Sequence, residues 1–269
     1  VIVFFALLLL PFQLLAADEE KSYLVGFAQD TMSNDWRAAQ VNEMKAALAP
    51  YPFIKFIHTD AEGNGFRQAF DLQKLDKQGV DILVTSPRAQ KAMTPVINAL
   101  SKRKPVILLT RKPMNEGYTA FVGADDYDIA AKAAGVIADK LAGKGRVFML
   151  KGVATATTAI AREQGFLAAL KHYPGIKVVA SPVANYRRDE AILKMDELLK
   201  QQLKFDAIYA HSDSMAVGAR IAMERAGLNP VDYVIVGIDY IAEARAAIRE
   251  GKQTASFTYP TAGKEGAEI

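Results

Sequence analysis

Short hydrophobic runs alternate with amphipathic segments along most of the chain. Runs such as Val106–Leu109 are apolar at every position, which is typical of strands that are buried on both faces of a parallel sheet. Between the runs, apolar residues recur at helical spacing, as in the series Met93, Val96, Ile97 and Leu100. This alternation predicts a doubly wound α/β fold that is built from βαβ units with right-handed crossovers.

Ten segments are predicted to be strands by their hydrophobic runs and the turn residues around them. They are Tyr23–Ala28, Phe53–His58, Asp81–Thr85, Pro105–Leu109, Ala120–Gly123, Arg146–Leu150, Lys177–Ala180, Ala207–Ala210, Tyr233–Gly237 and Ala255–Thr258. In open sheets of this kind, ligands bind at the carboxyl ends of the strands. The candidate functional residues are therefore those that directly follow each strand.

The beginning of the chain has a different pattern. Residues 1–15 are almost entirely apolar and are followed by Ala16 and Ala17 and then by three acidic residues. This pattern predicts a signal peptide over residues 1–17, cleaved after Ala17, because the run is shorter than the roughly 20 apolar residues of a spanning helix. An uncleaved signal anchor that tethers the protein is the alternative. Either reading places the protein outside the cytoplasm, and we expect the periplasm.

Composition narrows the function classes. The chain has 269 residues, of which 51% are hydrophobic and 23% charged, with a net charge of +3. Basic and acidic residues are interspersed, so the sequence has no basic patch of the kind that binds nucleic acid. It contains no cysteine, which excludes disulfides, thiol nucleophiles and cysteine metal sites.

The usual enzyme signatures are missing from the sequence. There is no G-x-G-x-x-G after the first strand, no phosphate-binding G-x-x-x-x-G-K-[ST] and no G-x-S-x-G. The three histidines form no metal-binding pair. His211 follows a strand and is a candidate general base, but a histidine at the rim or in a hydrogen bond is the favoured interpretation. Asp125 and Asp126 form a possible carboxylate pair, but helix capping accounts for them. We therefore expect a binding protein that is not an enzyme and uses neither metal nor cofactor.

The strand-end motifs resemble those of the type I periplasmic sugar-binding proteins of the ribose, galactose and galactofuranose type. The resemblance runs from about Tyr23 to the end of the chain and rests on the order and spacing of several motifs. These motifs are Ser33–Ala39, Gln78–Asp81, Ala161–Phe166, Ala210–Ala219 and Val236–Asp239.

The resemblance implies two Rossmann-like lobes, joined by three crossovers, that close over a ligand. The first lobe would comprise residues 23–123 and 255–269, and the second residues 124–254. The expected function is capture of a small sugar by a monomeric protein and its delivery to a membrane ABC permease. The alternative is the ligand-sensing domain of a membrane receptor such as a sensor kinase.

The resemblance also implies which residues bind the ligand. Trp36 matches the aromatic residue that packs on the apolar face of a sugar, and Asn34 and Arg37 belong to the same motif. Arg111 and Arg162 match arginines whose planar guanidinium groups hold hydroxyls. A core position for Trp36 and surface salt bridges for the arginines are the alternatives.

Further candidates follow the later strands. Asp239 matches a carboxylate that accepts sugar hydroxyls, and it can also cap the helix that begins near Ile241. Ser212 stands where the family often has Asn. Asp213 is expected to cap the next helix and to reach the ligand. Weaker candidates come from the first lobe and its continuation, namely Gln29, Ser86, Thr258 and, if the alignment slips by one position, Tyr259.

Two departures from the family pattern concern ligand and context. Thr110 stands where many members have Asp, so a standard pyranose site is in doubt. The sequence ends at Ile269, where the family continues with further strands and the third crossover. This ending keeps both the importer and the sensor interpretations open.

Overall fold

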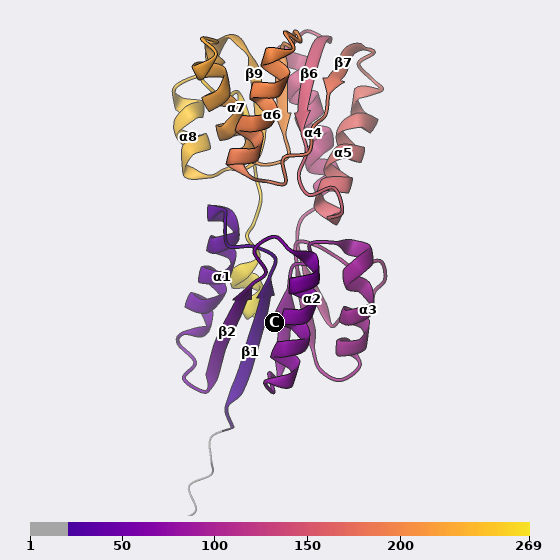
Figure 1. Cartoon of the computed structure of the whole chain (residues 1–269), viewed down its shortest axis with the longest axis vertical. Helices are drawn as coiled ribbons and strands as arrows, with labels where there is room; N and C mark the ends of the chain where they lie inside the picture. Colours follow the sequence, from indigo (N-terminus) through magenta and orange to yellow (C-terminus); the bar gives the residue numbers. More distant parts are fainter. Residues whose placement is uncertain (1–20) are drawn as a thin grey trace, which may run out of the picture.

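The predicted strands all form, and each lies within two residues of its expected bounds. A computed structural model describes residues 21–269. It divides the strands into two parallel five-stranded sheets, one in each of two lobes stacked along the long axis (Figure 1). The predicted signal peptide, residues 1–17, falls outside the described range. Among the helices of residues 21–269, none is long and apolar enough to cross a membrane.

The sheet of the first lobe has the order β2-β1-β3-β4-β5. Helices α2 and α3 cover one face, and α1 covers the other through Val41, Met44 and Leu48. The elements of this lobe are β1 (Tyr23–Gln29), α1 (Asp35–Leu48), β2 (Ile54–Asp60), α2 (Gly65–Lys77), β3 (Ile82–Thr85), α3 (Gln90–Ser101), β4 (Val106–Leu109) and β5 (Ala120–Val122).

The sheet of the second lobe has the order β10-β9-β8-β6-β7. Helices α4 and α5 pack together on one face, and α6 and α7 on the other. The elements are α4 (Asp126–Lys140), β6 (Lys144–Leu150), α5 (Thr157–Leu170), β7 (Gly175–Ala180), α6 (Arg188–Lys200), β8 (Ala207–Ala210), α7 (Asp213–Arg225), the 3-10 turn η1 (Pro230–Asp232), β9 (Val234–Asp239), α8 (Ala242–Arg249) and β10 (Ala255–Thr258).

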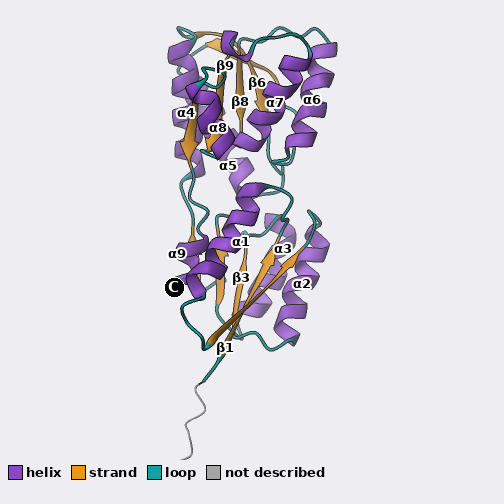
Figure 2. Cartoon of the chain, turned by 90° about the vertical axis from the view of Figure 1, so that its left-hand side faces the viewer, coloured by secondary structure: helices purple, strands orange, loops and turns teal. Residues whose placement is uncertain are grey.

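The chain crosses between the lobes twice within residues 21–269, at residues 123–125 and 259–262. The expectation that all of residues 255–269 belong to the first lobe is wrong for Ala255–Thr258, because this strand pairs with β9. The strand is held there by Ser256, whose hydroxyl donates to Asp213 at 2.6 Å. The chain then returns to the first lobe, where α9 (Gly263–Ala267) packs beside α1 (Figure 2).

The two lobes touch each other through several hydrogen bonds. The backbone N–H of Gln90 donates to Thr155 O at 2.9 Å, and that of Lys112 donates to Thr157 Oγ1 at 3.2 Å. A longer contact of 3.4 Å joins Asn34 Nδ2 to Tyr186 O. The structure therefore represents a closed arrangement, in which the carboxyl ends of both sheets face the space between the lobes.

Candidate ligand-binding site

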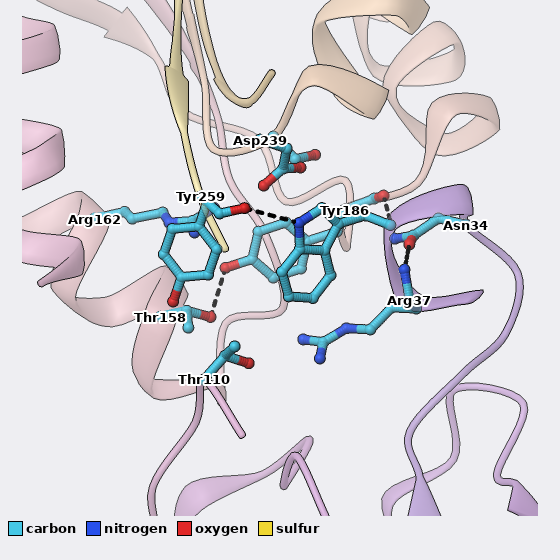
Figure 3. Close-up of a pocket in the computed structure, with 10 residues that line it drawn as sticks. Asn34, Arg37, Thr110, Thr158, Arg162, Tyr186, Asp239 and Tyr259 are labelled. Carbon is cyan, nitrogen blue, oxygen red and sulfur yellow. Dashed lines mark hydrogen bonds between the residues drawn. The ribbon is translucent and has the colours of Figure 1, made fainter. Parts of the chain in front are cut away.

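A pocket lies between the lobes, where the strands of both sheets end (Figure 3). Aromatic, hydroxyl, guanidinium and carboxyl groups from both lobes surround the space. The lining residues are Asn34, Trp36, Arg37, Thr110, Thr158, Arg162, Tyr186, Ser212, Asp239 and Tyr259.

The first turn of α1 carries three of the predicted site residues into the pocket. Asn34 is the N-cap of the helix, and its side-chain oxygen accepts from the backbone N–H of Arg37 at 2.7 Å. The cap fixes the start of the helix, so Trp36 and Arg37 project from a rigid turn. The indole N–H of Trp36 points to Tyr259 O at 3.4 Å, and the two rings lie 5.7 Å apart. Trp36 is half-buried and packs against the second lobe, so it is not a core residue of its own lobe.

The floor of the pocket is built by charged groups of the first lobe. Asp30 is buried and pairs with Arg111 at 2.7 Å, with Arg37 at 3.4 Å and with Arg88 at 3.7 Å. Arg37 also donates to Ser86 Oγ at 2.8 Å. Burial foremost, and then the nearby Arg111, lower the pKa of Arg37 to about 10. Asp30 and Ser86 hold Arg37 in place at the pocket.

Arg111 lies at the base of the pocket. It is 1% exposed, is not among the ten lining residues and pairs with Asp30. Its guanidinium carbon is 5.6 Å from the ring centre of Tyr186, a lining residue of the other lobe. The alternative of a surface salt bridge is wrong because the pair is buried, and the ligand contact of Arg111 stays a prediction.

The second lobe contributes Arg162 from α5. Its Nε donates to Asp126 Oδ1 at 2.7 Å and its Nη1 donates to the carbonyl oxygen of His211. Burial is the largest influence on Arg162 and acts to lower its pKa, but Asp126 acts together with Tyr186, Tyr259 and Asp239 to hold this pKa above its usual value. Asp125 caps α4 as expected, by accepting from the N–H of Asp128, whereas Asp126 is used to hold Arg162.

Tyr259 stands at the crossing from the second lobe to the first. Its hydroxyl donates to Asp126 Oδ2 at 3.1 Å, and Arg162 lies 4.5 Å above its ring. Tyr259 is 5% exposed, whereas the neighbouring Thr258 is exposed and lies off the pocket. The structure therefore places Tyr259 at the pocket, one position after the Thr258 that the sequence favoured.

Sequence reasoning missed two lining residues, Tyr186 and Thr158. Their hydroxyls lie 2.9 Å apart (Figure 3). The ring of Tyr186 rests on Gly152, where an added Cβ would stand 2.0 Å from Cζ, so a glycine is required there. Tyr186 comes from the loop between β7 and α6, where no hydrophobic pattern indicates a buried residue. Thr158 lies in the first turn of α5, the helix that follows strand β6. Its position after a strand is the sequence signal that could have identified it.

Asp239 and Ser212 close the pocket from the second lobe. Asp239 lies over the aromatic side chains at the end of β9 (Figure 3). Burial raises its pKa well above the usual value, and Arg162 lowers it by a smaller amount. The alternative role of Asp239 as a helix cap is wrong, since Ile241 is the N-cap of α8. Ser212 is the N-cap of α7 and accepts from the N–H of Met215 at 3.4 Å.

Asp213 neither lines the pocket nor caps its own helix. Its carboxylate accepts from the N–H groups of Tyr240 and Ile241 at 2.7 and 3.3 Å, and from Gln253 and Ser256 at 2.8 and 2.6 Å. Four donors satisfy a buried carboxylate, so Asp213 has a structural role that joins α7, α8 and β10. Gln29 and Ser86, the weaker candidates of the first lobe, are also buried beneath the lining residues.

Three of the lining residues have left-handed backbone conformations. The φ angles are +62° at Thr110, +63° at Tyr186 and +113° at Asp239. Such angles are costly for residues other than glycine, and they concentrate where function requires a particular geometry. Thr110 lies on the pocket, and its hydroxyl is 3.2 Å from Ser86 Oγ.

The site offers hydrogen-bonding groups and aromatic rings for packing. Within residues 21–269, no group of three or more His, Cys, Asp or Glu side chains could hold a metal ion. His211 is buried behind the pocket, where its Nδ1 accepts from the N–H of Gly152 at 3.3 Å. Burial lowers the pKa of His211 well below its usual value, which makes it a poor general base.

Two parallel-sheet lobes that enclose a polar and aromatic pocket at their strand ends define a two-lobed binding protein of the periplasmic type. The model of the periplasmic binding protein domain matches residues 25–268, and the chain belongs to this family.

Individual relatives agree with this assignment. A xylitol-binding protein of Mycolicibacterium smegmatis is 32% identical over 200 residues, which is 74% of this chain and 57% of that protein. The ribose import binding protein of Bacillus subtilis is 29% identical over 240 residues, 88% of this chain and 76% of that protein. The chain thus spans little more than half of the first relative's length.

A solved structure with the same fold comes from a signalling protein. The fructose-binding periplasmic domain of a hybrid two-component system superposes with a TM-score of 0.87 at 33% identity. The match covers 92% of this chain and 83% of that domain. The expected resemblance to type I periplasmic sugar-binding proteins is therefore confirmed, and so is the fold.

Proposed function

We propose that the protein captures a monosaccharide-sized ligand between its two lobes in the periplasm and delivers it to a membrane ABC importer. One observation carries the proposal. Aromatic rings and hydrogen-bonding groups from both lobes converge on a single pocket where the strands of the two sheets end. The relatives that bind xylitol and ribose support a sugar or polyol as the ligand.

The mechanism is closure of the lobes around the ligand. Trp36 and Arg37 belong to the first lobe, and Arg162 and Asp239 to the second. A ligand that contacts both sets stabilises the closed state over the open one, because it binds the closed state more tightly. The rings pack on the apolar C–H face of a sugar, while the guanidinium and carboxyl groups bind its hydroxyls.

A thermal-shift panel of pentoses, hexoses, polyols and sugar acids tests the proposal with the purified protein. A ligand at about 100 times its Kd stabilises the folded state by about 2.7 kcal/mol, which for a chain of this size raises the Tm by several degrees. We expect at least one compound to do so at millimolar concentration. If none raises the Tm, the protein does not bind this class of ligand.

The similarity to a sensor domain favours one second candidate, the input domain of a membrane signalling receptor. Both roles use the same pocket, so ligand binding does not separate them. The coding sequence beyond Ile269 distinguishes the two roles. A cytoplasmic kinase or other signalling domain in the same reading frame supports the sensor, and a stop codon after a short extension, next to genes for a permease and an ATPase, supports the importer.

A further inference from the structure

The floor of the pocket carries more guanidinium groups than carboxylates. Arg37, Arg88 and Arg111 all lie within 3.7 Å of the single carboxylate of Asp30. None of the three has a second ion-pair partner within residues 21–269. Glu190 of the other lobe, whose charge reaches Arg88, is already held by Asn185 and Arg187. A net positive charge therefore remains beneath the pocket.

Arg37 brings this charge to the ligand. Apart from the shared Asp30, its partners are the neutral side chains of Gln40 and Ser86, which accept from Nη1 at 3.0 and 2.8 Å. Its Nη2 has no partner among the described residues, and the guanidinium points across the pocket toward Thr110 (Figure 3). The lowered pKa of Arg37 agrees with a charge that its surroundings do not fully compensate.

The second lobe presents a matching donor. The Nε and Nη1 atoms of Arg162 are bonded to Asp126 and to the His211 carbonyl, but Nη2 has no partner in the described part of the chain. The amino ends of α5 and α7 also reach the pocket through Thr158 and Ser212, and helix amino ends favour negative charge. The single carboxylate among the ten lining residues is Asp239.

We infer that the ligand is an acidic monosaccharide, a sugar or polyol acid, whose carboxylate binds Arg37 and meets Arg162 when the lobes close. The Nη2 atoms of Arg37 and Arg162, both free within residues 21–269, can each donate a charged hydrogen bond to a carboxylate, which is a stronger bond than one to a neutral hydroxyl. The neutral Thr110 on the pocket lining fits this ligand, because a carboxylate at that position would repel it. The inference rests on the proposed function and narrows its ligand class.

Isothermal titration with matched pairs tests the inference. The probes are galactose and galacturonate, glucose and glucuronate, and xylitol and xylonate, each at pH 7.5. We expect one acid to bind at least about tenfold more tightly than its neutral partner, since a charged hydrogen bond adds more than the 1.4 kcal/mol that corresponds to a factor of ten. The preference should shrink as the salt concentration rises.

Variants locate the carboxylate. Arg37→Gln should weaken the acid about tenfold or more and change the neutral partner much less, while Arg37→Lys should keep part of the preference. The matched control is Arg103→Gln, which removes an exposed arginine paired with Asp76 on the outside of the same lobe and should change neither affinity. If a variant does not fold, the affinities of the unaltered protein for each acid and its neutral partner still test the inference.

The outcomes separate this inference from the proposed function. A neutral sugar that binds as tightly as its acid, or more tightly, overturns the acidic ligand and leaves the sugar-binding function standing. A sugar phosphate that binds more tightly than every carboxylate overturns the assignment of a carboxylate. If no member of any pair binds, the inference is wrong, and the wider thermal-shift panel decides the proposed function.

Discussion

At the scale of single residues, Asp239 combines an unusual backbone with an unusual environment. It has a φ of +113° and stands at the end of β9, and burial raises the pKa of its carboxyl well above 3.8. The folded state therefore binds this proton more tightly than the unfolded state does. The stabilising contribution is fully present below pH 3.8 and is lost as the pH rises through the raised pKa.

The substitution Asp239→Asn tests this arrangement. The amide cannot ionise, so we expect the ligand-free variant to be more stable than the original protein at pH 8, with a Tm about 2–4 °C higher. The difference should disappear near pH 4, where both side chains are neutral. Ligand affinity should fall, because an acceptor for hydroxyls is lost. Thermal unfolding between pH 4 and 8 measures the effect, and a difference that does not depend on pH contradicts it.

Most of the pocket residues could be predicted because they directly follow strands or begin helices. Asn34, Trp36 and Arg37 belong to the turn after β1, and Ser212 and Asp239 follow β8 and end β9. The others could not, because their positions depend on tertiary contacts. Tyr186 reaches the pocket through a left-handed loop that rests on Gly152, and Arg111 is drawn beneath the floor by the buried Asp30.

At the scale of elements, the close packing of α4 on α5 depends on Gly165. An added Cβ there would stand 2.1 Å from the backbone oxygen of Tyr127. Gly135, on α4, has nothing within 4 Å of the same atom. The two helices also carry Asp126 and Arg162, so their separation sets the position of an ion pair at the pocket.

Two alanine substitutions should therefore have opposite effects. Gly165→Ala should destabilise the protein by about 2 kcal/mol, because the backbone of α4 must move. Gly135→Ala should stabilise it by about 0.5–1 kcal/mol, because alanine has the higher helix propensity and no clash arises. Urea unfolding of both variants measures the difference. Equal stabilities would show that the helices are not packed as closely as the structure describes.

Strand positions were predictable because strands buried on both faces leave uninterrupted hydrophobic runs. The sheet to which each strand belongs was not predictable. The run Ala255–Thr258 has the same pattern in either lobe, and the choice is made by Ser256 and Gln253, which donate to the buried carboxylate of Asp213. A hydrophobic pattern indicates that a segment is buried, but it does not indicate which elements pack against that segment.

At the scale of the whole molecule, ligand binding and contact between the lobes should be coupled. Trp36 is the single tryptophan of the chain, and it packs against Tyr259 at the junction of the lobes. A ligand that closes the lobes should reduce the radius of gyration in solution scattering. It should also protect Trp36 from quenching by acrylamide, since the closed state buries the indole.

The contact between Lys112 and Thr157 allows this coupling to be varied without touching the pocket lining. Thr157→Val removes the acceptor of an inter-lobe hydrogen bond, which is worth about 0.5–1.5 kcal/mol. The closed state should be weakened and the ligand affinity should fall about twofold to tenfold. The matched control is Thr258→Val, because Thr258 is exposed and lies off the pocket. If Thr258→Val weakens binding as much as Thr157→Val does, the inter-lobe contact does not determine affinity, and Thr258 regains the role that the sequence suggested.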